Sequence, residues 1–278
     1  MNVLERLLGE FAEQPAPGGA QLAAAQALRA HSLPTRREEN WRYANLRALE
    51  GVARFRPDSP AAPGPAIAAL PEPLAGFTRL VFVDGMRSPG GVLPDAAQIT
   101  RVPMDAALAA DSVATTYETT GDGRMGLIAR LFAPDPLALR ITGPASLEII
   151  FLTTSAVSGS YTEISVEIAA GARVALVERH LGLATPSTLP DTATAALNCG
   201  NLRVRLGADS QLQHTRLQQT AANALRYDTL SASLGEHADY RLRHMAAGGG
   251  SDRSSAQIRL QGREASVQIR ALAAARGS

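Results

Sequence analysis

The sequence predicts a mainly β protein, preceded by a smaller mixed α/β region that is rich in helix. Two observations carry this prediction: apolar residues alternate with period two after Pro136, and glycine turns recur at regular spacing. The chain has 278 residues, of which 45% are hydrophobic, so it can bury a sizeable core made mainly of Leu, Val, Ile and Ala. We therefore expect an amino-terminal region over residues 1–136 and a β core over residues 137–278.

Apolar residues at helical spacing predict two short helices at the amino-terminal end, over residues 3–11 and 22–29. A Pro-Ala-Pro-Gly-Gly stretch separates them. Residues 55–77 are rich in Pro and Ala and predict a linker or an irregular wrap. Beyond it, the residues from Arg79 to Gly85 predict a strand that ends in a turn, and residues 103–110 and 125–132 predict helices.

The segment LPTRREENWRYANL, residues 33–46, contains the only Trp of the chain. Pro34 and Thr35 can start a helix, and the adjacent acids Glu38 and Glu39 would favour the positive end of its dipole. On such a helix Trp41 would share a face with the leucines at 46 and 49, Tyr43 would lie near the edge of that face, and the two acids would be exposed to solvent. We expect Trp41 to pack on the next layer rather than to stack on a ligand.

In the carboxyl-terminal half, alternating runs such as Ile164-Val166-Ile168 and Leu202-Val204-Leu206 predict strands. Turns of the form G-x-x-[AS]-x-apolar begin at positions 207, 235 and 262, which are 28 and 27 residues apart. Such regular spacing is typical of a stacked β-solenoid. Antiparallel sandwiches also combine short alternating strands with glycine turns, so periodicity alone leaves both architectures open.

Composition excludes several classes of function. The formal net charge is +1, which offers no general attraction to nucleic acid or to an anionic membrane. All 27 basic residues are Arg, so the chain cannot form a Lys-containing phosphate loop or a Schiff base. With Cys199 as the single Cys, it also has no internal disulfide and no CxxC zinc motif. We find neither a secretory signal nor a membrane-spanning run and expect a cytoplasmic protein.

No residue pattern in the sequence points to an assembled active site. None of the five histidines forms a metal-binding motif with another; they are His31, His180, His214, His237 and His244. His214 and His244 are in phase with apolar strand neighbours, so we expect both to face inward and to be hydrogen-bonded. Cys199 is expected to be a small buried hydrophobe, and Gly248–Gly250 a flexible turn. Glu163 and Glu167 form a near pair that a solvated strand edge would explain. We therefore assign no catalytic, cofactor-binding or metal-binding residue.

The segment 33–46 resembles a signature of the SufB/SufD family, and most closely its SufD branch. RLVFVDGMRS, EISVEIAAGARVALVERHLG and LNCGNLRVRLGADSQLQHTRLQ resemble successive strands of the same family, so the likeness covers most of residues 33–270. The resemblance implies a right-handed parallel β-helix and a non-catalytic scaffold in iron–sulfur cluster assembly by the SUF system. It implies a SufB-like paralogue and a SufC-like ATPase as partners, is compatible with a homodimer, and assigns the cluster to the assembled complex rather than to this chain alone.

Members of the family continue beyond the point where this sequence stops, with further coils, a Cys- and His-bearing segment and a terminal helical region. We therefore expect a β-helix that lacks its carboxyl-terminal end. No position matches the Cys- and His-bearing segment, so no cluster ligand is assigned. Two alternatives are a β-helix enzyme acting on carbohydrates, which would need clustered acids on one face, and a purely structural solenoid.

Overall fold

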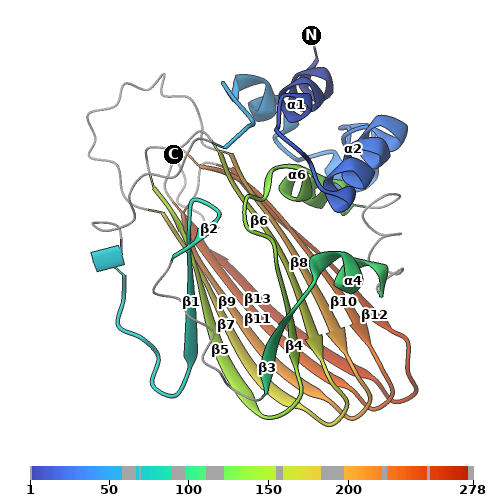
Figure 1. Cartoon of the computed structure of the whole chain (residues 1–278), viewed down its shortest axis with the longest axis vertical. Helices are drawn as coiled ribbons and strands as arrows, with labels where there is room; N and C mark the ends of the chain where they lie inside the picture. Colours follow the sequence, from blue (N-terminus) through green and yellow to red (C-terminus); the bar gives the residue numbers. More distant parts are fainter. Residues whose placement is uncertain are drawn as a thin grey trace.

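The computed structural model describes residues 2–57, 67–68, 70–88, 98–110, 122–154, 159–182, 197–220, 224–248 and 251–274. Two sheets face each other, and helices cover the outer face of one of them (Figure 1). The strands are β1 (Thr78–Val83), β2 (Met86–Arg87), β3 (Ile99–Val102), β4 (Leu137–Ile141), β5 (Ala145–Thr153), β6 (Gly159–Ile168), β7 (Arg173–Gly182), β8 (Leu197–Leu206), β9 (Gln211–Thr220), β10 (Leu225–Leu234), β11 (Asp239–Gly248), β12 (Ser251–Leu260) and β13 (Ser266–Ala274). The α-helices are α1 (Val3–Ala12), α2 (Gly19–His31), α4 (Met104–Ala109) and α6 (Arg124–Phe132), and two 3-10 helices are η1 (Glu39–Trp41) and η2 (Leu46–Gly51).

From β4 onward the chain alternates between the two sheets. The larger sheet has the order β13-β11-β9-β7-β5-β1-β2 and the smaller sheet the order β12-β10-β8-β6-β4-β3. Each strand pairs in parallel with the strand two positions along the chain, so that Leu202, for example, lies between Ile164 and Leu230. Parallel pairing at a constant register is the arrangement of stacked coils, which confirms the mainly β, parallel β-helix prediction over the antiparallel sandwich.

The recurring glycine turns are explained by close stacking of successive coils. A Cβ atom on Gly207 would lie 2.7 Å from the backbone nitrogen of Ala170, and one on Gly262 would lie 2.0 Å from that of Glu236. Two residues after each glycine the backbone has positive φ, at Asp209, His237 and Glu264, with values of 56°, 55° and 57°. The motif therefore combines a glycine that permits close approach of coils with a left-handed residue that turns the chain.

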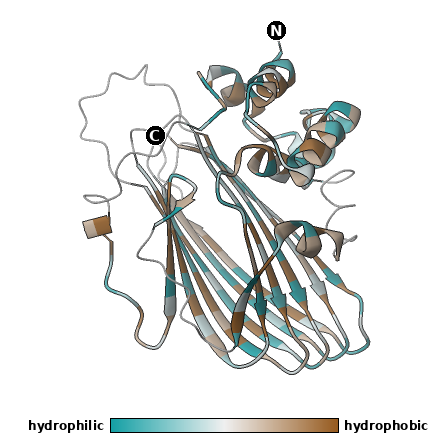
Figure 2. Ribbon diagram, viewed as in Figure 1, coloured by the Kyte–Doolittle hydropathy of each residue, from teal (hydrophilic) through white to brown (hydrophobic). Residues whose placement is uncertain are grey.

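The two sheets bury a core that is apolar at the end of the coils where these tight turns lie. Figure 2 shows hydrophobic and hydrophilic residues alternating along the strands, as the period-two pattern predicts. Leu, Ile and Val from both sheets fill this half, for example Leu176 and Leu212 of the larger sheet against Val204 and Leu230 of the smaller. A second core lies between the outer face of the smaller sheet and helices α1, α2 and α6.

The predicted strand at 79–85 and helices at 3–11, 22–29, 103–110 and 125–132 are confirmed as β1, α1, α2, α4 and α6. The predicted α-helix after Pro34 is wrong, because this segment forms only the short helices η1 and η2. A tertiary contact holds it instead: Glu38 pairs with Arg124 of α6, and its carboxylate also accepts a local 2.8 Å hydrogen bond from the backbone nitrogen of Thr35. Glu38 is thus partly exposed, with 38% of its side chain accessible, and Glu39 is exposed as the sequence led us to expect.

Trp41 does what the sequence predicts and packs this segment onto the next layer. Its side chain is 1% exposed, and its indole nitrogen donates a 2.7 Å hydrogen bond to Asp122. The guanidinium of Arg253 on β12 lies 4.0 Å from the centre of the Trp41 ring. Tyr227 on β10 donates a 2.9 Å hydrogen bond to the carbonyl of Asn45, so two strands of the smaller sheet hold the segment in place. Tyr43, by contrast, is 89% exposed.

The Pro- and Ala-rich segment is a wrap on the larger sheet where it can be described; residues 58–66 and 69 lie outside the described residues. Arg79 of β1 donates 2.8 Å hydrogen bonds to the carbonyls of Pro71 and Glu72. The same guanidinium donates a 2.7 Å bond to Glu148, whose carboxylate is fully buried. This charged contact holds residues 70–77 against the outer face of β5.

Along the stacking direction, the sheets begin with β2 and β3 on one side, and β12 and β13 are their outermost described strands on the opposite side. Their apolar side chains are largely exposed, among them Leu260, Ile269 and Leu272. No helix within the described parts of the chain is long and apolar enough to cross a bilayer.

Candidate functional site

The inward-facing side chains change from apolar to charged at the end of the coils opposite the tight turns. Along β7, Val174 and Leu176 are followed on the same face by Glu178 and His180. The same change occurs on β9 and β10, and it creates a group that we call the interior polar cluster. Its members are buried, and they come from both sheets: Glu178, His180, His214, Arg216, Arg226 and Asp228.

Glu178 is the centre of the cluster within the larger sheet. Its carboxylate accepts hydrogen bonds from the Nε2 atoms of His214 and His180, at 2.8 and 3.0 Å, and from the Nε of Arg216 at 2.9 Å. Burial raises the pKa of Glu178, but Arg216, His214 and these hydrogen bonds outweigh burial and hold the pKa well below its usual value. Glu178 is therefore ionised, and its lone pairs are occupied by donors.

Asp228 joins the two sheets. It lies on β10 of the smaller sheet and pairs with Arg216 of the larger sheet and, at 3.3 Å, with Arg226 of its own strand. Burial raises the pKa of Asp228, but Arg216 and Arg226 together lower it below its usual value. With Glu178 also ionised, two acids balance two guanidiniums.

The two histidines of the cluster are held in defined tautomers by their partners. His180 faces Glu178 with Nε2 and lies 3.1 Å from a guanidinium nitrogen of Arg226 with Nδ1, so Nε2 donates and Nδ1 accepts. His214 likewise accepts from the hydroxyl of Tyr240 at 2.8 Å. Burial and the nearby Arg226 lower the pKa of His180 to about 4, so this imidazole is neutral at physiological pH.

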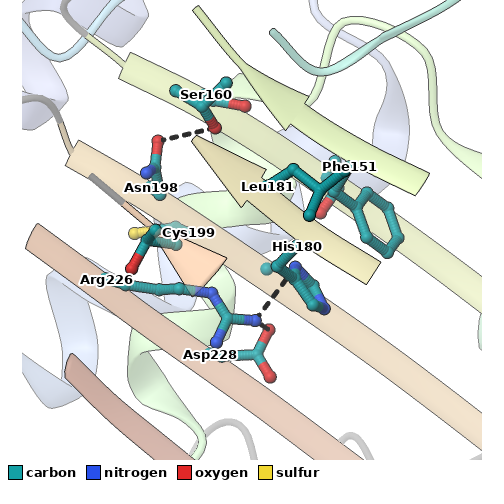
Figure 3. Close-up of a pocket in the computed structure, with 12 residues that line it drawn as sticks. Phe151, Ser160, His180, Leu181, Asn198, Cys199, Arg226 and Asp228 are labelled. Carbon is teal, nitrogen blue, oxygen red and sulfur yellow. Dashed lines mark hydrogen bonds and ion pairs between the residues drawn. The ribbon is translucent and has the colours of Figure 1, made fainter. Parts of the chain in front are cut away.

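A small cavity of about 30 Å³ borders the cluster at the end of the coils away from the tight turns (Figure 3). In Figure 3, Arg226 lies between His180 and Asp228, and the ring of Phe151 lies beside His180, with 4.6 Å between the ring centres. The rest of the wall is mainly hydroxyl and amide groups: Thr153, Ser160, Thr162, Asn198 and Thr220. The volume is enough for one or two water molecules. The lining residues can form hydrogen bonds, but the imidazole of His180 and the carboxylate of Asp228 are both engaged by the guanidinium of Arg226.

The remaining sequence candidates lie apart from one another. His31 is exposed near the end of α2, and His237 lies on a turn with Nδ1 3.2 Å from Glu264. His244 lies beside Arg216 on the inward face of β11, and its Nε2 atom is buried with no hydrogen-bond partner among the described residues. His214 is confirmed as a hydrogen-bonded inward-facing residue; His244 faces inward as predicted, but lacks a partner at that atom. Gly248 has a φ of 87° at the end of β11, and residues 249–250 of the predicted turn lie outside the described residues.

Cys199 is a buried hydrophobe, as the sequence predicts. It lies on β8 at the cavity wall, but its side chain belongs to the core between the smaller sheet and the helices, with Tyr161 and Tyr227. Burial is the main cause that raises the pKa of the thiol far above its usual value. This thiol is therefore not a ready nucleophile or metal ligand.

The interpretation of Glu163 as part of a solvated edge is wrong. Glu163 is 1% exposed on the outer face of β6, where it accepts a 2.8 Å hydrogen bond from Arg130 of α6 and a 2.9 Å bond from Asn201 of β8. Glu167, four residues further along β6, is partly exposed and pairs with Arg205 at 2.8 Å. The sequence showed the two acids on one face, but only the packing of α6 buries the first and not the second. Among the described residues, no three His, Cys, Asp or Glu side chains lie close enough to hold a metal ion.

Residues 151–278 match the family model described as "SUF system FeS cluster assembly, SufBD core domain". The match supports the SufB/SufD family. The matched range is just under half of the chain and contains strands β6 to β13. It supports a role in the assembly of iron–sulfur clusters by the SUF system. No curated protein sequence matches the chain.

Proposed function

We propose that this chain is a non-catalytic, SufD-like scaffold subunit for iron–sulfur cluster assembly, working in the cytoplasm with a SufB-like paralogue and a SufC-like ATPase. The observation that carries the proposal is the match of the SufBD core model to residues 151–278. The stacked parallel coils, with each strand paired at a constant register, agree with the β-helix that the sequence resemblance implies.

The chemistry of the described residues supports a scaffold more than an enzyme. Glu178 and Asp228 are engaged by guanidinium groups, and Cys199 is buried with a raised pKa. A carbohydrate-active β-helix enzyme would need a carboxylate free to protonate or attack a glycosidic bond. Since the chain has no Lys, a phosphate loop must come from another protein, which suits a SufC-like ATPase as partner. The cluster is then cargo of the assembled complex rather than a cofactor of this chain alone.

The test is co-expression of the full chain with the SufB-like and SufC-like proteins of the same organism, followed by affinity purification and size exclusion. We expect a complex containing all three proteins, and we expect ATP hydrolysis only when the SufC-like protein is present. Omitting each partner in turn provides the control and shows which of them the chain contacts. Failure of the chain to enter a complex with either partner would refute the scaffold assignment.

A second measurement addresses the cluster. Anaerobic reconstitution with iron and sulfide, followed by absorbance in the visible range, should give no stable cluster on the chain alone and a cluster on the complex. A cluster that forms stably on the isolated chain would contradict the proposal that the chain contributes no ligand set of its own.

A further inference from the structure

The outer face of the larger sheet has an exposed area that the wrap at residues 70–77 does not cover. Two rows of side chains cross neighbouring strands there at matching register. One row is apolar and consists of Leu217 on β9, Met245 on β11 and Leu272 on β13. The next row places Arg243 directly beside Arg270. We call these five residues the outer patch; Met245 is 49% and Leu272 64% exposed.

The two arginines of the outer patch are an unbalanced pair of like charges. Among the described residues, no carboxylate lies within ion-pair distance of Arg243 or Arg270. Arg241, two residues earlier on the same strand face, shows the contrast, because its Nε lies 2.9 Å from Asp239. Like charges directly opposite each other on neighbouring strands destabilise a sheet. An anionic partner would relieve this repulsion.

The spacing of the outer patch fits an α-helix that lies across the strands. Neighbouring strands are about 4.8 Å apart, so the apolar row of Leu217, Met245 and Leu272 spans about 10 Å. Helix positions i, i+4 and i+7 advance along the helix axis by about 6 Å and then about 4.5 Å, close to the strand spacing, which places one apolar residue over each strand. The arginine row lies about 7 Å to one side, where the flank of the same helix would present its polar residues.

We propose that the outer patch is the docking site of an amphipathic helix from a partner protein, with Glu or Asp on the flank that faces Arg243 and Arg270. Met and Arg are enriched in protein interfaces, and an apolar centre bordered by charge is their usual anatomy. This inference is independent of the proposed function, because it depends only on the exposed face of the larger sheet.

Two other occupants fit the patch less well. A nucleic acid would need many phosphate contacts, whereas the outer patch offers only two guanidiniums, those without a carboxylate partner among the described residues, in a chain of net charge +1. A lipid surface would need a broader basic and apolar face, since two charges near an anionic membrane contribute little attraction. Both remain outcomes of the experiment below.

The experiment uses the full chain and a synthetic helical peptide of about five turns, with Leu at i, i+4, i+7 and i+11 and Glu along one flank. A second peptide carries Lys in place of every Glu. Fluorescence anisotropy of the labelled peptides measures Kd at low and at physiological salt. We expect the Glu peptide to bind, its affinity to fall as salt rises, and the Lys peptide to bind at least tenfold more weakly.

Variants of the outer patch locate the binding site. We expect the double substitution Arg243→Gln and Arg270→Gln to weaken binding of the Glu peptide about tenfold, or about threefold for each guanidinium. Leu272→Gln should weaken both peptides, and because this side chain is exposed the variant should fold. Arg173→Gln is the matched control, since Arg173 is exposed on β7 of the same sheet but outside the outer patch. This control should leave the Kd unchanged.

Several results would overturn the proposal. These are equal binding of the Glu and Lys peptides, no binding of the Glu peptide, or equal loss of affinity in the control and in the double variant. Binding of the chain to vesicles rich in anionic lipid, or to duplex DNA, that the double variant abolishes would replace the helix by that ligand. Concentration-dependent dimerisation abolished by the double variant would replace the partner helix by a second copy of the chain.

Discussion

Replacing Glu178 by Gln should strongly destabilise the β-helix. Glu178 is 2% exposed and accepts bonds of 2.8 to 3.0 Å from two histidines and Arg216. The amide has no charge, and it cannot accept at both terminal atoms, so Arg216 loses one of its two acids and one histidine loses its acceptor. Removing one partner from a buried ion pair costs about 3 to 5 kcal/mol. We expect the free energy of unfolding to fall by about 3 kcal/mol or more.

Urea unfolding at neutral pH measures this change. Emission from Trp41, the single Trp, and circular dichroism report the unfolding of the segment at 33–46 and of the sheets, respectively. Glu167→Gln is the matched control, because its side chain is 27% exposed and its partner Arg205 is 43% exposed. An exposed pair of this kind contributes about 0 to 1 kcal/mol.

The pH dependence gives an independent check. Because the folded pKa of Glu178 is lowered, its stabilising contribution is complete above the unfolded pKa of 4.5 and is lost as the pH falls through the folded pKa. The difference between wild type and Glu178→Gln should therefore persist at neutral pH and shrink in strong acid. If Glu178→Gln lies within about 1 kcal/mol of wild type at neutral pH, or no further from it than Glu167→Gln, the reasoning about the interior polar cluster is refuted.

Three further predictions concern single positions. The pKa of His180 is lowered from 6.5 to about 4, so the free energy of unfolding should fall as the pH drops through this range, by about 2 kcal/mol at about pH 5. His180→Gln should make the free energy of unfolding, measured by urea titration, depend less steeply on pH. An unchanged pH dependence in this variant would exclude His180 as its source. Cys199 should react with a thiol reagent such as Ellman's reagent only at the rate of unfolding, and rapid reaction of the native protein would contradict its burial. Gly207→Ala should lower the free energy of unfolding in urea by about 1 to 3 kcal/mol, because its Cβ would meet the preceding coil. Gly9→Ala, with open space around it in α1, should be neutral or stabilising. Equal effects of the two substitutions would contradict the close stacking of coils at Gly207.

Part of the interior polar cluster could be predicted from the sequence. Glu178 and His180 continue the inward phase of Val174 and Leu176, and this continuation of an apolar phase by charged residues is the signal that sequence reasoning missed. What the sequence could not show is that Arg216 meets Asp228. These residues lie on opposite sheets, and their contact depends on how far each coil advances before the chain crosses over.

The segment at 33–46 shows the same division. The helical face that Trp41 would share with the leucines at 46 and 49 predicted that Trp41 would pack inside, and it does. The helix predicted around it does not form, because contacts of Glu38 with Arg124 and of Asn45 with Tyr227 fix a different backbone path. Local propensity amounts to tenths of a kcal/mol per residue, and tertiary contacts of this number exceed it.

The sequence by itself determined the class of the fold and the positions of its strands and turns. Period-two alternation and a repeated glycine turn are local sequence patterns, so they can be recognised without knowing which segments pack together. It also carried the likeness to the SufB/SufD family. Only the tertiary structure decided which charges are buried, which acids are paired with arginines, and that Arg243 and Arg270 have no carboxylate partner among the described residues. Those properties depend on which side chains from distant coils share a low-dielectric interior or an exposed face, and pairwise distance, not order along the chain, sets their energy.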